Sequence, residues 1–576
     1  MIFYFTGTGN SLAAAQTIAR ATDDLLVDIG AAYKYKDFDF TLAQGEQLGF
    51  VFPVYNYTTP PIIDAFLKRA RFRTGNKETF TPDYCFAVIS CGAFVGSTAR
   101  VFGKRLLDAQ GINLDASFSV KSVGNCTYLY APAQGEKRKR LLAGAELAAR
   151  ETANRIAARE HVRAEHRNPL GIVLSKFTEK DEKPRSTSEF FALPTCISCG
   201  QCAAVCTTGA ITIYNSIGQA WRALHNPKKR VVFQIAPAVR VAVGEAFGMP
   251  VGTNVIDKIV TALKIMGADE VYDTTFGADL TVMEESEEFL ERLKKGGPFP
   301  MFTSCCPAWV KYLEFENPKY LHHISSCKSP MEMFGAVLKD RYKALDEKDG
   351  RETYHIAIMP CTAKKMEAAR PEFCHDGKPD VDLVLTTQEL INMISEAGVR
   401  FSEIEGESPD LPFGIGTGAG TIFGTTGGVA EAVVRRCLPD KSRNALQEIQ
   451  FSGLRGNEPL RTATFQVGET SIRIAVVHGL VHAQKLLKEI EAGTAYYDLV
   501  EVMTCQGGCV GGAGQPYGLK LRKEQRAAGL YEADRSATIK CSDRNPIVGE
   551  LYEEGLKARH KELLHVHYGQ KDKKKK

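Results

Sequence analysis

Half of the sixteen cysteines of this chain lie in three short clusters. The clusters cover residues 196–206, 305–306 and 505–509, and a ninth cysteine, Cys361, follows a stretch that reads as a strand. In a long chain without the pattern of a secreted protein, closely spaced C-x-x-C steps are more typical of metal sites than of disulfides. The spacing therefore predicts bound metal inside a sizeable core.

The length of 576 residues predicts about three or four domains of ordinary size. The formal net charge is +4, and the run Lys571–Lys576 alone carries five lysines and one aspartate, so the rest of the chain is neutral. A neutral body gives little support for nucleic-acid binding. No stretch is long and apolar enough for a membrane span, and the first residues lack the basic leader of a signal peptide. We therefore expect a cytoplasmic protein.

The N-terminal residues read as a buried strand, a glycine-rich loop and an amphipathic helix. Backbone N–H groups of such a loop bind phosphate at the start of a helix. The loop has neither the third glycine of the dinucleotide fingerprint nor the lysine of a Walker loop. One alternative is an ordinary glycine-rich turn between strand and helix.

The sequence of this loop resembles the FMN phosphate loop of flavodoxins. Two later segments, Pro53–Thr58 and Ser90–Ala93, stand where flavodoxins place the loops around the flavin ring, and the resemblance covers about residues 1 to 165. It implies a doubly wound parallel sheet that binds FMN. The implied contacts are Thr6, Gly7, Thr8, Gly9, Asn10, Ser11, Tyr55, Asn56, Tyr57, Cys91 and Gly92.

The first cysteine cluster, Cys196, Cys199, Cys202 and Cys206, has the ligand spacing of a bacterial 4Fe-4S site. In two-cluster ferredoxins the fourth cysteine serves the other cluster, and this chain has no second motif of that kind. Either Cys206 folds back to complete the cluster, or a distant residue does, or the cluster is labile. A zinc knuckle is the alternative, although zinc more naturally uses two separated pairs. We expect one 4Fe-4S cluster.

From Gln234 to Tyr568 the chain resembles the catalytic domain of iron-only hydrogenases. Three motifs carry the resemblance: TSCCPAW around Cys306, MPCTAKKME around Cys361, and EVMTCQGGC with Cys505 and Cys509. In that family these four cysteines bind a 4Fe-4S subcluster, and the sulfur of Cys509 also bridges to a di-iron subsite with CO, cyanide and a bridging dithiolate. Thiolates suit iron–sulfur clusters, and nearby glycines let the backbone approach them.

The same resemblance implies a proton route. Cys305, beside the ligand Cys306, would stay a free thiol that passes protons to Glu285, Ser325 and Glu288, with Arg292 near the exit. Residues 281–292 have helical periodicity, which places the two glutamates and Arg292 on one face. By composition alone this segment is a solvated acidic helix, and Cys305 is a buried structural cysteine.

Other family positions are implied to surround the di-iron site. Lys364 would donate to a cyanide ligand, Ala236, Pro237 and Ser329 would line the pocket, and Met359, Phe423 and Met503 would exclude water. Three residues depart from the common family pattern: Met331, Gly511 and Ala513. These departures bear on catalytic bias and oxygen tolerance.

The resulting expectation is a multidomain α/β protein. A polar linker, EKDEKPRSTSE, precedes a boundary near residue 185. The expected parts are a flavodoxin-like domain with linker, a ferredoxin-like segment, a large hydrogenase domain and a small-subunit-like extension, at residues 1–185, 186–227, 228–516 and 517–576.

The expected activity is reversible formation of hydrogen from protons and electrons. The electrons would pass through FMN and the 4Fe-4S cluster, with ferredoxin, flavodoxin or another redox protein as partner and with hydrogenase maturation proteins loading the site. The alternatives are a hydrogen sensor, and a scaffold like the cytosolic iron–sulfur assembly factors.

Overall fold

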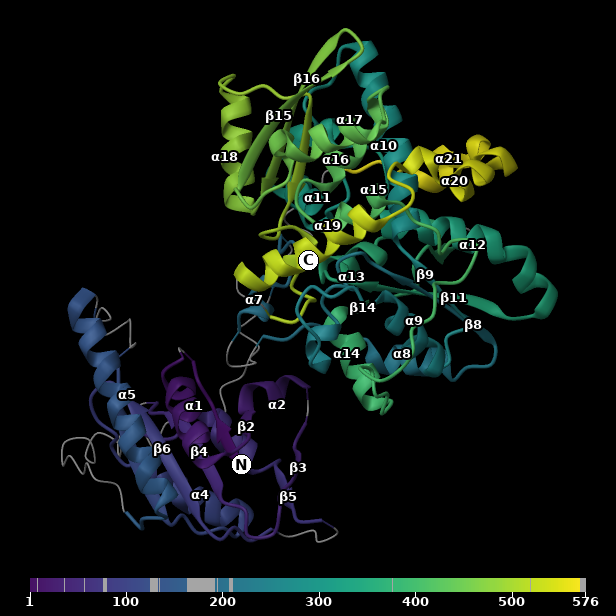
Figure 1. Cartoon of the computed structure of the whole chain (residues 1–576). Coiled ribbons are helices and arrows are strands. Elements are labelled where there is room, and N and C mark those ends of the chain that lie inside the picture. The colour runs from purple at the N-terminus through teal and green to yellow at the C-terminus, as the bar shows by residue number, and fades with distance from the viewer. Residues whose placement is uncertain are drawn as a thin grey trace. The chain divides into compact units, whose positions relative to one another are not determined.

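In the computed structural model the chain divides into two compact units (Figure 1). The first comprises Met1–Phe190 with Val205–Thr212, and the second comprises Phe191–Ala204 with Ile213–Lys576. The polar linker, the boundary near residue 185 and the lysine-rich end lie outside the described residues. The structure describes all residues except 8, 36, 56, 76–79, 125–132, 134, 163–191, 194, 207–210, 376, 518–519 and 570–576.

The first unit contains a five-stranded parallel sheet in the order β2-β1-β4-β6-β7. Counted along the chain, this is the 2-1-3-4-5 order of doubly wound, flavodoxin-like sheets. The predicted fold class is therefore confirmed for this unit. A separate pair joins β3 (Asp39–Thr41) to β5 (Arg71–Arg73). The five strands are β1 (Ile2–Tyr4), β2 (Leu26–Asp28), β4 (Leu48–Pro53), β6 (Cys85–Cys91) and β7 (Ala116–Lys121).

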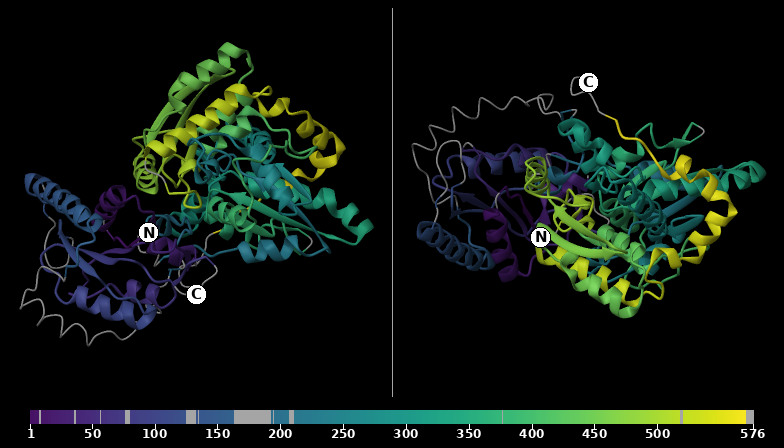
Figure 2. Two further views of the ribbon diagram at one scale, coloured as in Figure 1. Left: turned by 60° about the horizontal axis from the view of Figure 1, so that its bottom comes forward. Right: turned by 90° about the horizontal axis from the view of Figure 1, so that it is seen from above.

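Both faces of this sheet are buried, because its strands are apolar at successive positions. Phe3 and Phe50 belong to a core that includes residues of α3 and α4, whereas Ile2 and Val51 belong to a core with α1 and α5. Figure 2 shows helices on both sides of the sheet. The helices are α1 (Asn10–Thr22), α2 (Ile29–Tyr35), α3 (Pro61–Leu67), α4 (Thr98–Gln110) and α5 (Gly135–Ala157).

The charged, helix-forming composition after the flavodoxin-like segments predicts a long helix from about Gly135 to His166, but the helix α5 is shorter. It ends at Ala157, and the described residues 158–162 that follow are not helical. Arg159 has a φ of 51°, a left-handed conformation that commonly ends a helix. The hydroxyl of Tyr84 donates to the carbonyl of Glu160 at 2.6 Å, which holds the turn against the body of the unit.

The second unit is built on two four-stranded sheets. One is wholly parallel in the order β14-β11-β8-β9, and the other has the order β10-β17-β16-β15, in which only β15 is antiparallel to its neighbour. A short hairpin joins β12 (Cys374–His375) to β13 (Lys378–Pro379). The strands of the two sheets are β8 (Lys229–Ile235), β9 (Glu270–Asp273), β10 (Met301–Phe302), β11 (Glu352–Met359), β14 (Leu383–Thr386), β15 (Leu460–Val467), β16 (Thr470–His478) and β17 (Leu499–Met503).

Helices surround these sheets, and the mixed α/β fold that the sequence predicts is confirmed. No helix among the described residues is long and apolar enough to cross a bilayer. The helices are α7 (Gln201–Ala204), α8 (Ile217–Leu224), α9 (Ile256–Ile265), α10 (Thr275–Lys295), α11 (Pro307–Glu316), α12 (Pro330–Asp349), α13 (Ala363–Ala368), α14 (Thr387–Glu396), α15 (Gly418–Thr421), α16 (Gly428–Cys437), α17 (Arg443–Ile449), α18 (Leu480–Glu491), α19 (Lys520–Ser536), α20 (Pro546–Leu551) and α21 (Lys557–Leu564).

Two buried contacts position the central helix α10 and its neighbours. A Cβ on Gly277 would lie 2.3 Å from the carbonyl oxygen of Pro330, so only glycine lets the start of α12 pack this closely on α10. The guanidinium of Arg435 on α16 bonds Asp534 on α19 at 2.8 and 2.9 Å and Glu431 at 2.6 Å. This buried ionic cluster joins the C-terminal segment to the body of the unit.

Candidate metal centre

Each of the three catalytic-domain cysteine motifs follows the carboxyl end of a strand. Cys305 and Cys306 come just after β10, Cys361 follows β11, and Cys505 and Cys509 follow β17. Ligand sites of parallel sheets form at these ends. Strands from both sheets of the second unit therefore supply one site.

A small apolar cavity of about 70 Å³ lies at this point. Besides the residues expected from the sequence, Thr274, Ala278, Pro330 and Met331 line it. Ser329 is next to this wall, and its hydroxyl donates to Glu367 at 3.0 Å. The expected residues that the cavity brings together are Ala236, Pro237, Cys305, Met359, Cys361, Lys364, Phe423, Met503 and Cys509.

The four cysteines expected as cluster ligands lie close enough to influence one another. Burial raises the pKa of Cys361 to about 12, and Cys306 adds to the shift. Burial also raises the pKa of Cys509 to about 12, with contributions from Cys361 and Cys306. The pKa of Cys505 lies well above its usual range for the same reasons. A set of four converging thiols is a donor set for an iron–sulfur cluster.

The backbone around Cys509 leaves no room for larger side chains. Gly508 has a φ of 87°, and a Cβ there would lie 2.6 Å from the backbone nitrogen of Thr426. At Gly511 a Cβ would lie 2.2 Å from the carbonyl oxygen of Gln506. Ala513 is buried, with 1% of its surface exposed. The departures at these positions thus belong to a tightly packed turn.

Lys364 places an ammonium group in the wall of the cavity. Its Nζ donates to Glu367 at 2.7 Å and to the carbonyl oxygen of Cys305 at 3.3 Å. Burial opposes the charged form, but Glu367 more than offsets it and raises the pKa of Lys364. An ammonium carries three donors, so one N–H remains for a group in the cavity.

Behind the cavity, α10 buries two acidic side chains. The composition-based reading of a solvated acidic helix is wrong for Glu284 and Glu285, which are 5% and 0% exposed. Burial raises the pKa of Glu285 to about 8, and the charge of Glu288 adds to the shift. Neither oxygen of Glu285 completes a hydrogen bond, although Ser325 and the Ser304 amide lie near enough to lower its pKa. Glu285 is therefore a carboxyl group poised to exchange protons near neutral pH.

Cys305 lines the cavity, and Ser325 and Glu288 lie near Glu285. Burial raises the pKa of Cys305 well above its usual range, and the charge of Glu285 is the next largest cause. The hydroxyl of Ser325 donates to Glu288 Oε2 at 3.2 Å, and Arg292 Nη2 donates to Glu288 Oε1 at 2.5 Å. The five residues thus lie near one another, with Cys305 at the cavity, Glu285 and Ser325 fully buried, and Glu288 and Arg292 partly exposed.

The first cysteine cluster contacts the catalytic motifs directly. The hydroxyl of Thr362 donates to the carbonyl oxygen of Ser198 at 2.8 Å. Gln201 Nε2 donates to the sulfur of Cys505 at 3.2 Å and to the carbonyl oxygen of Gly511 at 3.1 Å. Thr362 follows the motif cysteine Cys361, and Gln201 lies between Cys199 and Cys202. No pattern in the sequence indicates these contacts.

Three expected ligands of that cluster, Cys196, Cys199 and Cys202, belong to the second unit. Burial raises the pKa of Cys199, and Cys202, Cys196 and Cys306 add to the shift, which shows that these sulfurs are close. Cys206 belongs to the first unit, where its sulfur accepts a hydrogen bond from the Ile211 N–H at 3.4 Å. Its role as fourth ligand stays a prediction.

In the first unit the expected flavin loops follow β1, β4 and β6. Thr6 accepts a hydrogen bond from the Gly9 N–H at 3.0 Å, and a Cβ on Gly7 would lie 3.2 Å from the Tyr55 hydroxyl. The structure therefore brings the first two loops together. Asn10 donates to the Val123 carbonyl at 3.0 Å, and the hydroxyls of Ser11 and Ser90 lie 2.7 Å apart, which ties the start of α1 to β6 and to the loop after β7.

Two aromatic side chains in the loops after β4 and β6 are exposed to solvent. Tyr55 is 40% exposed, and Phe94, which the sequence analysis missed, is 41% exposed three residues after Cys91. Tyr57 has a φ of 61°, and a Cβ on Gly96 would meet it at 2.7 Å. Gly92 is exposed. Thr8 and Asn56 lie outside the described residues.

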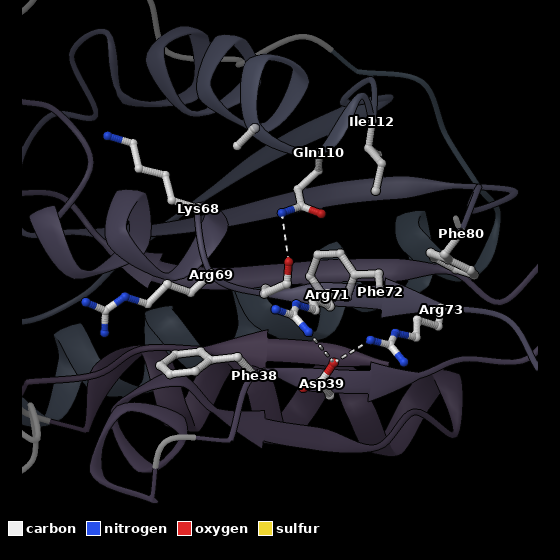
Figure 3. Close-up of a pocket in the computed structure, with 12 residues that line it drawn as sticks. Phe38, Asp39, Lys68, Arg69, Arg71, Phe72, Arg73, Phe80, Gln110 and Ile112 are labelled. Carbon is white, nitrogen blue, oxygen red and sulfur yellow. Dashed lines mark hydrogen bonds and ion pairs between the residues drawn. The ribbon is translucent and has the colours of Figure 1, made fainter. Parts of the chain in front are cut away.

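A larger hollow of about 860 Å³ lies at the opposite edge of the first unit (Figure 3). Lys68 and Gln110, at the ends of α3 and α4, line it, and in a parallel α/β unit such helix ends lie opposite the phosphate loop. Arg73 pairs with Asp39 at 3.1 Å. This hollow is therefore not the expected flavin site.

Two family models match the second unit. "Iron only hydrogenase large subunit, C-terminal domain" matches residues 229–513, and "Iron hydrogenase small subunit" matches residues 520–571. Subunit HndD of the NADP-reducing hydrogenase of Solidesulfovibrio fructosivorans is 43% identical over 65% of this chain and 66% of its own length. Iron hydrogenase 1 of Clostridium pasteurianum is 38% identical over 60% and 62%. The chain spans just under two thirds of these relatives.

A solved structure of the [FeFe]-hydrogenase HydA1 from Chlamydomonas reinhardtii is 37% identical, with a TM-score of 0.53, over 62% of this chain and 99% of that one. At lower identity, Protein NAR1 of Arabidopsis thaliana is 30% identical over 66% of this chain and 85% of its own length. The cysteine motifs, the shared fold and both family models establish that this chain belongs to the iron-only hydrogenase family.

Proposed function

We propose that this chain is an enzyme that interconverts protons, electrons and molecular hydrogen. The observation that carries the proposal is an apolar cavity lined by the ligand-type cysteines Cys361 and Cys509 and by Cys305, whose thiol lies close enough to buried Glu285 to feel its charge. The thiols of Cys306, Cys361, Cys505 and Cys509 would hold the H-cluster, which combines a 4Fe-4S subcluster with a di-iron subsite. When bound, this H-cluster supplies the iron at which hydrogen is made or split.

The chain's own residues would deliver and retain protons. Cys305 holds a proton, because burial disfavours its thiolate. Glu285 exchanges it, since a pKa of about 8 lies near neutral pH. Ser325 and Glu288 continue the route through a 3.2 Å hydrogen bond.

The remaining cavity residues would hold the group in place and exclude water. The third N–H of Lys364 is available to a polar ligand in the cavity. Ser329 holds Glu367, which in turn holds Lys364. Apolar and thioether side chains form the other walls: Ala236, Pro237, Met359, Phe423 and Met503.

Electrons would reach the site through a 4Fe-4S cluster on Cys196, Cys199, Cys202 and Cys206. Gln201 supports this route, because it touches Cys505 from within the same motif. FMN in the first unit would exchange electrons with a ferredoxin, a flavodoxin or another redox protein. Exposed Tyr55 supports the flavin assignment.

The enzyme proposal is tested by expressing the full chain with and without hydrogenase maturation proteins. The matured protein should evolve hydrogen and exchange hydrogen with deuterium, and the protein made without maturation should do neither. A fully iron-loaded protein with no activity in both assays would refute the enzyme and favour the alternatives, a sensor or an assembly scaffold. The presence of Cys305, Lys364 and Met359 around one cavity supports the enzyme.

The flavin assignment has a separate test. Replacing Thr6 and Ser11 by alanine in the full chain should lower bound flavin, measured by absorbance, because both hydroxyls lie in the phosphate loop. Thr17→Ala, on the exposed side of α1, is the matched control. Equal flavin content in both proteins would refute the assignment.

A further inference from the structure

Glu288, the last acidic residue of the proposed relay, has two kinds of partner. Its Oε1 accepts from Arg292, and its Oε2 accepts from the N–H and the hydroxyl of Ser326, both at 2.9 Å. A guanidinium has donors only and does not lose its proton in proteins, so Arg292 cannot accept a proton from Glu288. A hydroxyl both donates and accepts, so Ser326 can pass one on.

Hydrogen bonds continue from Ser326 into the C-terminal segment. The Ser326 hydroxyl lies 2.8 Å from His565 Nδ1, and His565 Nε2 lies 2.8 Å from Glu284 Oε2. His560 Nδ1 lies 2.8 Å from the same oxygen of Glu284. Five side chains from α10, α21 and the adjoining loops therefore form one unbroken chain of hydrogen-bonding groups.

The exposed fractions of these side chains show which end of the hydrogen-bonded series reaches solvent. The side chain of Glu284 is 6% exposed, that of His565 is 15% exposed and that of His560 is 29% exposed, so the path ends at solvent. Burial would raise the pKa of Glu284, but hydrogen bonds from His565, Tyr552 and His560 lower it overall. Glu284 thus remains an anionic acceptor between two imidazoles. Imidazole is the side chain best suited to proton exchange near neutral pH.

We propose that Ser326, His565, Glu284 and His560 form a second branch of the proton route, which joins Glu288 to solvent beside α21. The inference deepens the proposed function and rests on it. In the outward direction, protonated Glu288 donates to the Ser326 oxygen as the hydroxyl proton of Ser326 moves to His565 Nδ1. His565 then releases its Nε2 proton to Glu284, Glu284 passes a proton to His560 Nδ1, and His560 releases its own Nε2 proton to water. Each step moves one proton and no electrons, and inward transfer is the reverse.

Water at Glu288 is the competing acceptor, because the side chain of Glu288 is 17% exposed. Matured full-length proteins carrying Ser326→Ala or His560→Ala distinguish the two routes. We expect about tenfold lower kcat for hydrogen evolution and a larger solvent deuterium isotope effect in both variants, with unchanged iron content. Ser326→Thr keeps the hydroxyl and should restore the rate. Added imidazole should rescue His560→Ala. His322→Ala removes an exposed histidine outside the branch and serves as the control.

An infrared acid titration provides a readout that does not depend on turnover. The carboxyl band of Glu288, assigned through its loss in Glu288→Gln, should shift in Ser326→Ala, because one hydrogen bond to Oε2 is removed. If the band does not shift, or if Ser326→Ala and His560→Ala keep wild-type rates and isotope effects, the branch is overturned. A wild-type protein that evolves no hydrogen would refute the proposed function instead.

Discussion

Replacing Glu285 by glutamine should make the protein more stable at neutral pH. The pKa of this fully buried carboxyl group is about 8, against 4.5 for an unburied glutamate. The native state therefore holds a proton that the unfolded state releases between these two pH values, so stability falls as pH rises from 4.5 to 8. At about 1.4 kcal/mol for each pH unit, the raised pKa of Glu285 lowers the free energy of unfolding by about 3 kcal/mol at pH 7. The amide introduced by Glu285→Gln cannot ionise, so the variant avoids this cost.

Differential scanning calorimetry of the cluster-loaded proteins measures this effect. For a unit of roughly 380 residues, 3 kcal/mol corresponds to a rise in melting temperature of about 4 °C at pH 7, shrinking towards zero at pH 4.5. Glu287→Gln, an exposed change on the same helix, should shift the melting temperature little at any pH. A Glu285→Gln protein that is no more stable at pH 8 than at pH 5, relative to wild type, would refute the reasoning.

Three further outcomes are expected. Cys305→Ala should keep its iron content yet lose hydrogen evolution by about a hundredfold or more, because the proton donor is removed, and wild-type rates would disprove the relay role. Gln201→Leu removes an N–H donor from the Cys505 sulfur, so the reduction potential of the adjoining cluster should fall by about 40 mV in a redox titration, and an unchanged potential would contradict this. Arg435→Leu leaves buried carboxylates without their main partner and should lower the free energy of unfolding in urea by about 3 kcal/mol; the exposed change Arg443→Leu is the control.

Local sequence patterns were sufficient for much of the fold. The strand, glycine-rich loop and helix at the N-terminus are β1, the Thr6–Ser11 loop and α1, and the periodic segment 281–292 lies inside α10. These predictions depend only on neighbouring residues, so a pattern can show them. The turn just after α5 is held by a hydrogen bond from Tyr84 to Glu160, and a contact between residues so far apart in sequence cannot be predicted from periodicity.

For the candidate site, too, the sequence predicted some features and not others. Its cysteines could be named because motif residues are close in sequence and typical of metal ligands. Burial of Glu284 and Glu285 could not be predicted, since their segment has the composition of a solvated helix. The bond from Gln201 to Cys505 joins positions about three hundred residues apart, and only the folded chain reveals it.

The place of β17 in its sheet has a consequence for how the protein is made. This strand is the last of the chain to join the sheet, yet it lies between β10 and β16 and carries Cys505 and Cys509 at its end. During synthesis from the N-terminus, β10 and β16 have no shared neighbour until Leu499–Met503 has left the ribosome. A complete set of the four proposed ligands therefore exists only after Cys509 has been translated, so a metal group held by all four cysteines could be inserted only after β17 has emerged.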